Sequence, residues 1–311
     1  MACRLPFARA RDTLLLGSGI RRRRAADRHE ISAIILAHSR PRPPAAPPYG
    51  GVSRFGWPTR HLRTLIYGRH AVTAALANPD RSWHRLVALA GHEQEARTLV
   101  AAATAIRRGD GESIRVLSRE DFAALLPEGA VHQGLAVAVE PLAEPDLGDV
   151  LRRAATLSGR RVIVLLDQVN DPHNVGAVLR SANAFGALAV VLPIHGAAPV
   201  AGALAKAASG ALETVPLIRV VNLARTLDQL KDAAFWICGL DETASQTLAA
   251  LDLGERVALV LGAEGGGMRR LVRERCDHLA RLPTRSKQPT INVSNAAAVA
   301  LYELMRERGN S

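Results

Sequence analysis

The sequence predicts an α/β protein with a doubly wound parallel sheet, and three observations carry this prediction. Continuous apolar runs follow residue 161, as expected of strands that helices cover on both faces. Stretches of helical length separate these runs, which is the pattern of βαβ units. Polar, glycine-marked patches follow three of the runs, and ligands collect at the carboxyl ends of parallel strands. The fold class therefore predicts where a site lies.

A smaller α/β domain is expected first, over residues 63–140, because strand and helix patterns alternate there after Leu65–Gly68. Its predicted strands are 85–89, 114–117 and 134–139, and its predicted helices are 69–76, 93–108 and 119–126. Residues 141–160 start with prolines and acidic residues and are predicted to be a linker.

The second domain is predicted over residues 161–311. Its expected strands are 162–166, 188–192, 234–238, 257–261 and 278–282. Its expected helices are 175–185, 201–208, 223–231, 268–275 and a last helix from about 295 to 308. The order of these segments along the chain gives the doubly wound layout.

The amino-acid composition favours a globular protein and argues against membrane-spanning, disulfide-rich and metal-binding classes. Hydrophobic residues make up 48% of the 311 residues, enough for two cores, but aromatics are only 4%, so Ala, Val, Leu and Ile must fill them. No apolar run approaches the length of a membrane span, so we expect no membrane partner. The three cysteines form no C-x-x-C pair, which indicates neither a disulfide framework nor a metal site and fits a cytoplasmic location.

The positive charge is concentrated at the start of the chain. Residues 1–65 hold 13 arginines, no lysine and three acidic residues, and so carry ten of the eleven net positive charges. Arg21–Arg24 and a proline-rich stretch lie in residues 1–62, which we expect to form a disordered, dispensable tail. A targeting peptide, an over-extended start and a basic segment that adds affinity for RNA are the alternative interpretations.

The first polar patch is Asn174-Val-Gly176-Ala-Val-Leu-Arg180, at a strand-to-helix junction. Helix capping and close packing account for its asparagine and glycine. An arginine in the first turns of a helix is opposed by the macrodipole, which favours a functional role for Arg180.

The second patch, Gly262-Ala-Glu264-Gly265-Gly266-Gly267, is either an ordinary glycine-rich turn or a loop whose backbone a ligand can approach closely, and the acidic Glu264 favours the second interpretation. It is neither a dinucleotide fingerprint nor a P-loop.

The third patch joins Leu282-Pro283 to Thr290-Ile291-Asn292-Val293-Ser294-Asn295. A helix cap explains only one of its polar residues, so the others are assigned to a ligand or partner.

Together these three ordered patches resemble the signature motifs of the SpoU (TrmH-type) RNA 2′-O-methyltransferases of the SPOUT superfamily. Two segments upstream, Tyr67-Gly68-Arg69-His70 and His132-Gln133-Gly134-Leu135, resemble the substrate-binding domain of the branch that acts on ribosomal RNA. The resemblance covers about 245 residues. It implies a SPOUT-type parallel sheet with a C-terminal deep trefoil knot, an L30e-like first domain and a homodimer.

The same resemblance implies S-adenosylmethionine as cofactor and a 23S rRNA guanosine as the expected substrate, with transfer RNA as the alternative. The implied catalytic residues are Arg180, Asn174, Glu264, Asn292 and Ser294. The implied cofactor-binding residues are Gly262, Leu282, Ile291, Leu261, Gly265 and Pro283. The implied RNA-binding residues are Arg180, Arg69, His132 and Gln133.

In this family the arginine of the first motif is proposed to activate the ribose hydroxyl, and the resemblance implies that role for Arg180. A guanidinium is protonated at neutral pH, so a clamp on phosphate or ribose suits its chemistry better than a base. A non-catalytic RNA-binding protein would be expected to carry a damaged motif. A nucleotide-dependent oxidoreductase is disfavoured because the first strand-to-helix turn lacks the glycine fingerprint.

Overall fold

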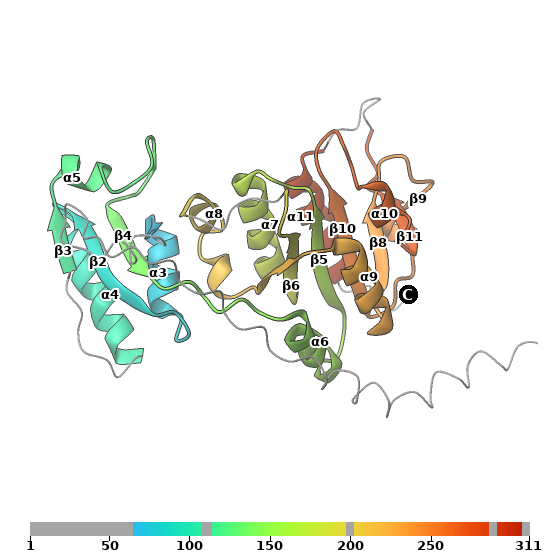
Figure 1. Ribbon diagram of the computed structural model, residues 1–311, viewed down its shortest axis with the longest axis horizontal. Helices are drawn as coiled ribbons and strands as arrows, with labels where there is room; N and C mark the ends of the chain where they lie inside the picture. Colours follow the sequence, from blue (N-terminus) through green and yellow to red (C-terminus); the bar gives the residue numbers. More distant parts are fainter. Residues whose placement is uncertain (1–64, 107–113, 197–201, 286–290, 307–311) are drawn as a thin grey trace, which may run out of the picture. The chain divides into compact units, whose positions relative to one another are not determined.

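The computed structural model describes residues 65–106, 114–196, 202–285 and 291–306, and these form two sheets with their helices (Figure 1). The predicted tail, residues 1–62, lies outside the described residues. Within the described part, no helix combines the length and the apolar character needed to cross a membrane. No group of three or more His, Cys, Asp or Glu side chains in this part is placed to hold a metal ion.

The first sheet has four strands in the order β1-β4-β2-β3. They are β1 (Leu65–Tyr67), β2 (Trp83–Leu89), β3 (Ile114–Leu117) and β4 (Leu135–Val139). The helices are α3 (Arg69–Ala77), α4 (Glu93–Ile106) and α5 (Arg119–Ala123). β4 pairs antiparallel with both β1 and β2, whereas β2 and β3 are parallel. The predicted alternation of strands and helices is present, with α5 shorter than expected.

The segment predicted to be a linker contains a helix, α6 (Leu147–Thr156). Asp146 caps its start by accepting a hydrogen bond from the backbone N–H of Gly148, 3.2 Å away. Val150 and Ala154 face inward and join one of the two cores of the large sheet. Part of the segment predicted to be a linker is therefore a helix that packs on the large sheet.

The second sheet has seven strands in the order β7-β6-β5-β10-β8-β11-β9, and every neighbouring pair is parallel. The strands are β5 (Arg161–Asp167), β6 (Ala189–Pro193), β7 (Leu217–Val220), β8 (Trp236–Leu240), β9 (Gln246–Thr247), β10 (Arg256–Gly262) and β11 (His278–Arg281). The predicted parallel sheet is confirmed. The edge strands β7 and β9 were not predicted.

Helices cover both faces of this sheet, as the continuous apolar strands predict. They are α7 (Pro172–Ala184), α8 (Gly202–Ala207), α9 (Leu223–Asp232), α10 (Arg270–Arg273) and α11 (Val293–Met305), with short 3-10 turns at Ala211–Glu213 (η3) and Leu248–Ala250 (η4). Alternate residues of β5 enter different cores. Val164 joins the core with residues of α7 and α11, and Leu165 joins the core with residues of α6 and α9. α10 is shorter than the predicted helix 268–275.

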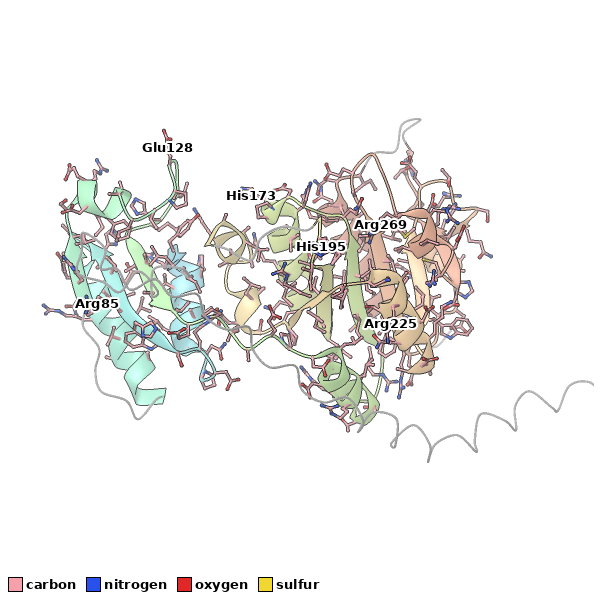
Figure 2. The ribbon with its side chains drawn as sticks, viewed as in Figure 1. Arg85, Glu128, His173, His195, Arg225 and Arg269 are labelled. Atoms are coloured by element: carbon pink, nitrogen blue, oxygen red, sulfur yellow. The ribbon has the colours of Figure 1, made fainter. Side chains whose placement is uncertain are left out.

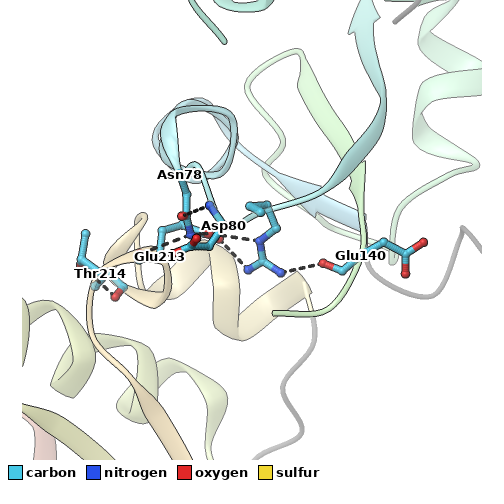
Figure 3. A network of polar contacts seen from close by, with 7 residues as sticks. Asn78, Asp80, Glu140, Glu213 and Thr214 are labelled. Atoms are coloured by element: carbon cyan, nitrogen blue, oxygen red, sulfur yellow. Dashed lines mark hydrogen bonds and ion pairs between the residues drawn. The ribbon is translucent and has the colours of Figure 1, made fainter. Parts of the chain in front are cut away.

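A buried ion pair joins the turn after α3 to η3 (Figure 3). The side chains of Arg81 and Glu213 are only 6% and 4% exposed, with 2.7 Å between Nη2 and Oε1. Asn78 donates a second hydrogen bond to Glu213, and Arg81 also donates to the carbonyl of Glu140. Both buried charges are thus matched, which the cost of burying an ion requires.

Candidate active site

The three polar patches meet at the carboxyl end of the large sheet. Asn174 Nδ2 donates to Glu264 Oε1 across 3.2 Å, and Asn292 Nδ2 donates to the same oxygen across 2.6 Å. Asn292 Nδ2 also lies 3.0 Å from Asn174 Oδ1, and the backbone N–H of Val293 points to Glu264 at 3.5 Å. One carboxylate oxygen therefore ties together three segments that are distant in the sequence.

Local structure positions each of these side chains. Asn174 lies in the first turn of α7, which Asp171 caps and Pro172 starts. Asn292 is the N-cap of α11, and its Oδ1 accepts hydrogen bonds from the backbone and hydroxyl of Ser294 at 2.9 and 2.6 Å. Capping thus fixes the direction in which the Asn292 amide donates. Ser294 is linked to the cluster by its hydrogen bonds to Asn292.

Glu264 lies on a tight loop that follows β10. Ala263 and Gly267 exchange two backbone hydrogen bonds, of 3.1 and 2.9 Å, which close the loop into a small hairpin. Gly262 packs so closely beneath this hairpin that a Cβ there would lie 2.1 Å from the carbonyl carbon of Gly267. Gly265 and Gly267 have φ of 75° and 62°, which glycine adopts without strain. The glycines are therefore needed for the shape of the loop.

A cavity of about 980 Å³ opens beside the cluster. Five of the six predicted cofactor residues line it: Leu261, Gly262, Gly265, Leu282 and Ile291. Pro283 does not line it, since its neighbours Leu282 and Thr284 supply that part of the wall. Glu264 and Asn292 also border this cavity, so two of the five predicted catalytic residues share it with the predicted cofactor residues. Asn174, Arg180 and Ser294 do not line it.

The sequence prediction missed another wall of the cavity, formed by the segment after β8. Asp241 accepts hydrogen bonds there from Thr243 Oγ1 at 2.6 Å and from Arg273 Nε at 2.8 Å. Burial raises the pKa of the Asp241 carboxyl, but the bonds from Thr243 and Arg273 outweigh it, so the net pKa is lowered. The position of Asp241 at the end of an apolar run was the available signal.

Arg180 stands apart from the cluster in the structure. It lies on α7, six positions after Asn174, and is exposed. Among the described residues its side chain neither lines the cavity nor has a hydrogen-bond or ion-pair partner. Its guanidinium is consequently available to a ligand from outside the protein.

The predicted RNA-binding residues of the first domain lie close together. Gln133 Oε1 accepts the backbone N–H of Arg69 at 3.1 Å, which caps the start of α3. The Arg69 guanidinium pairs with Glu95 at 2.6 Å, and the His132 ring lies on Phe122 with 4.6 Å between centroids. Gln133 itself has φ of 52°, an uncommon conformation for a residue other than glycine. All three side chains thus have structural contacts within the first domain.

His132 occupies an environment that favours its neutral form. Burial is the main cause that lowers its pKa, and the charges of Lys206, His92 and Arg119 lower it further. Its Nδ1 accepts the backbone N–H of Gly134 at 3.1 Å, which places the ring proton on Nε2. Nε2 is therefore a hydrogen-bond donor.

Comparisons with known proteins identify the family. Residues 161–302 match the SpoU rRNA Methylase family, and residues 65–145 match the RNA 2′-O ribose methyltransferase substrate binding family. The chain belongs to the SpoU family and is an RNA 2′-O-methyltransferase. The family expected from the three motifs is confirmed.

Individual relatives agree with this assignment. The 23S rRNA (guanosine-2′-O-)-methyltransferase RlmB of Coxiella burnetii is 41% identical over 78% of this chain and 95% of its own. A tRNA/rRNA methyltransferase of Synechocystis, itself uncharacterized, is 38% identical over 86% of this chain and 67% of its own. The SpoU methyltransferase AviRb of Streptomyces viridochromogenes, solved with AdoMet, superposes with a TM-score of 0.63 at 23% identity, over 79% of this chain and 91% of that one. That last likeness supports the fold.

Proposed function

We propose that this chain transfers the methyl group of S-adenosylmethionine to the ribose 2′-hydroxyl of a guanosine in 23S rRNA. The observation that carries the proposal is the Asn174–Glu264–Asn292 cluster beside the 980 Å³ cavity, since it unites all three family motifs at one place. The relatives named for the 23S rRNA reaction match about two fifths of their residues over nearly their whole length.

The cavity suits S-adenosylmethionine. Its lining combines backbone at Gly262 and Leu282 with apolar side chains such as Leu261 and Ile291, as an adenine ring and a ribose require. A Cβ at Gly265 or Gly266 would meet no atom within 4 Å, so the loop backbone is open to a ligand. When bound, the cofactor supplies a sulfonium methyl group that is electrophilic without any metal.

The chain's own residues supply position and charge. Glu264 and the two asparagines hold the three loops in one arrangement, and alignment of reacting groups alone contributes large rate factors. Arg180, exposed on α7, clamps a phosphate or ribose oxygen of the RNA and orients its 2′-hydroxyl toward the cavity. In the first domain, Arg69, His132 and Gln133 form part of the surface that selects the RNA.

The proposal includes several structural expectations. Residues 63–140 bind substrate as an L30e-like domain and residues 161–311 catalyse, with the loops after β10 and β11 in a trefoil knot. The strand order, with β10 between β5 and β8, is compatible with such a knot. Val299 and Tyr302 on α11 are 49% and 58% exposed, an apolar surface suited to a homodimer in the cytoplasm.

The decisive test is methyl transfer from labelled S-adenosylmethionine to unmodified 23S rRNA, with the 2′-O-methyl position mapped by resistance to alkaline cleavage. Labelling at one guanosine is the expected result. Labelling of transfer RNA instead would show that transfer RNA, and not 23S rRNA, is the substrate. The absence of cofactor binding in calorimetry would overturn the proposal.

Two variants make this test specific. Arg180→Ala should keep the fold and cofactor affinity but lose most methylation, because the exposed guanidinium contacts only the RNA. Arg225→Ala, an exposed arginine on α9 (Figure 2), should retain activity. Full activity of Arg180→Ala would remove Arg180 from the reaction.

A further inference from the structure

A buried acidic residue outside the cluster contacts the segment that follows the loop carrying Glu264. Asp167 is the last residue of β5 and is fully buried, with 0% exposure. In the parallel register of β5 and β10, it lies opposite Gly262, where the loop begins. A charge in such a place is costly unless it is fully paired.

One residue provides the pairing of Asp167. The backbone N–H of Arg269 donates to Oδ2 at 2.7 Å, and its Nε donates to Oδ1 at 2.8 Å. Arg269 Nη2 lies 2.7 Å from the same Oδ1. Arg269 precedes the first residue of α10, so its N–H would otherwise lack a helical partner. Asp167 thus caps the start of this helix through the backbone and holds the arginine side chain as well.

This contact fixes the downstream end of the loop. Gly267, whose two hydrogen bonds to Ala263 close the hairpin, is only two positions before Arg269. Arg269 itself is 46% exposed and lies at the end of the sheet where the loop is found (Figure 2). β10 holds the upstream end of the loop, and Asp167 holds the other.

We propose that Asp167 is a positioning residue for the methyl donor: through Arg269 it holds the 262–268 loop in the conformation that binds the cofactor. This inference rests on the proposed function, because it assumes that the cavity beside the loop binds S-adenosylmethionine. Asp167 does not line the cavity, so it acts on the cofactor only through the loop.

The test compares Asp167→Asn and Arg269→Gln with the wild-type full-length chain. Calorimetry gives the cofactor Kd, steady-state assays give kcat and the KM for cofactor and RNA, and thermal unfolding reports folding. Asp167→Asn should raise the cofactor Kd about tenfold or more, as expected for loss of charge-assisted hydrogen bonds. The loss should appear in the KM for cofactor more than in kcat, because saturating cofactor re-forms the loop, and the KM for RNA should stay unchanged.

Arg269→Gln keeps the backbone N–H bond and should therefore show a smaller increase in Kd. The double variant should bind the cofactor no more weakly than Asp167→Asn alone, because both substitutions disrupt the same contact between Asp167 and Arg269. Glu274→Gln, which removes an exposed ion pair with Arg270 on the same helix, is the matched control and should leave every value unchanged.

An unchanged cofactor Kd in a folded Asp167→Asn variant would overturn the inference, and so would a rise in Kd that Glu274→Gln shares. If Asp167→Asn does not fold, Arg269→Gln decides: an unchanged Kd overturns the inference and a raised Kd with normal folding supports it. Failure of the wild-type chain to bind the cofactor would instead overturn the proposed function, and this inference with it.

Discussion

Glu264 Oε1 lies 2.6 Å from Asn292 Nδ2, although one residue belongs to the loop after β10 and the other caps α11. The same oxygen accepts from Asn174, at the start of α7. A single carboxylate therefore sets the relative positions of the start of α7 and of the two loops that border the cavity. Loss of this carboxylate should affect catalysis more than folding, because the cluster is largely exposed and the cores lie elsewhere.

Replacement of Glu264 tests this relationship. Glu264→Ala removes the shared acceptor and should lower kcat/KM on the order of 100-fold, the size expected from a small misplacement of aligned groups. Glu264→Gln keeps an acceptor oxygen and should lose less. Thermal unfolding should change by only a few degrees for either variant. Equal activity of the alanine variant and wild type would contradict the role given to the carboxylate.

Alanine substitutions at two glycines of the loop after β10 should have opposite outcomes. Gly262→Ala would place a Cβ 2.1 Å from the Gly267 carbonyl carbon, so the hairpin must open and cofactor binding should be lost. Gly266→Ala would meet no atom within 4 Å and should leave the unfolding temperature unchanged. Calorimetric titration with the cofactor and thermal unfolding together measure both effects. Wild-type affinity in Gly262→Ala would show that the loop tolerates rearrangement.

The buried pair Arg81–Glu213 predicts a large loss of stability. Arg81→Ala leaves the carboxylate of Glu213, which is 4% exposed, without its charged partner. The cost of breaking a buried pair in this way is about 3 to 5 kcal/mol in the free energy of unfolding. Asp149→Asn disrupts the exposed pair between Asp149 and Arg152 and should cost less than about 1 kcal/mol. Denaturant titration of the two variants should separate them clearly.

His132 predicts a dependence of stability on pH. Its pKa is lowered in the folded protein, so its contribution is fully present above the ordinary value of about 6.5. As the pH falls from 6.5 toward the folded pKa, the unfolded chain binds the proton more readily and stability decreases. His132→Asn, whose amide oxygen can replace the acceptor Nδ1, should therefore lose less stability than wild type between pH 7.5 and 5.5.

Denaturant unfolding at the two pH values measures this difference. His195→Asn changes an exposed histidine (Figure 2) and should behave as wild type. Identical losses of stability in His132→Asn and wild type would show that the His132 ring does not contribute to the pH dependence.

Much of the large sheet could be predicted because its strands are continuous apolar runs. Strands β5, β6, β8 and β10 all lie within one or two residues of the predicted ranges. Strand β7 was missed because it is a short edge strand, only partly buried, that contains Arg219. Helix α6 was missed because Pro145 and the acidic residues before it favoured a linker, although Asp146 is its cap.

Much of the candidate site could also be predicted from the sequence. The rule that ligands collect at strand ends located Glu264 and Asn292 correctly at one cavity. The order of strands within the sheet, however, depends on tertiary packing, which no local pattern encodes. For that reason the sequence could not indicate that Arg269 would pair with Asp167, 102 positions earlier.

The position of β10 has a consequence for the synthesis of this protein. β10 lies between β5 and β8, yet both of these neighbours precede it in the chain. While the ribosome is still adding residues up to 255, β5 and β8 each have an edge of unpaired backbone N–H and C=O groups, the kind of surface that promotes aggregation. The central strand must then enter between two strands already made, and Asn292 arrives later still. The catalytic site can be completed only after almost the entire chain has left the ribosome.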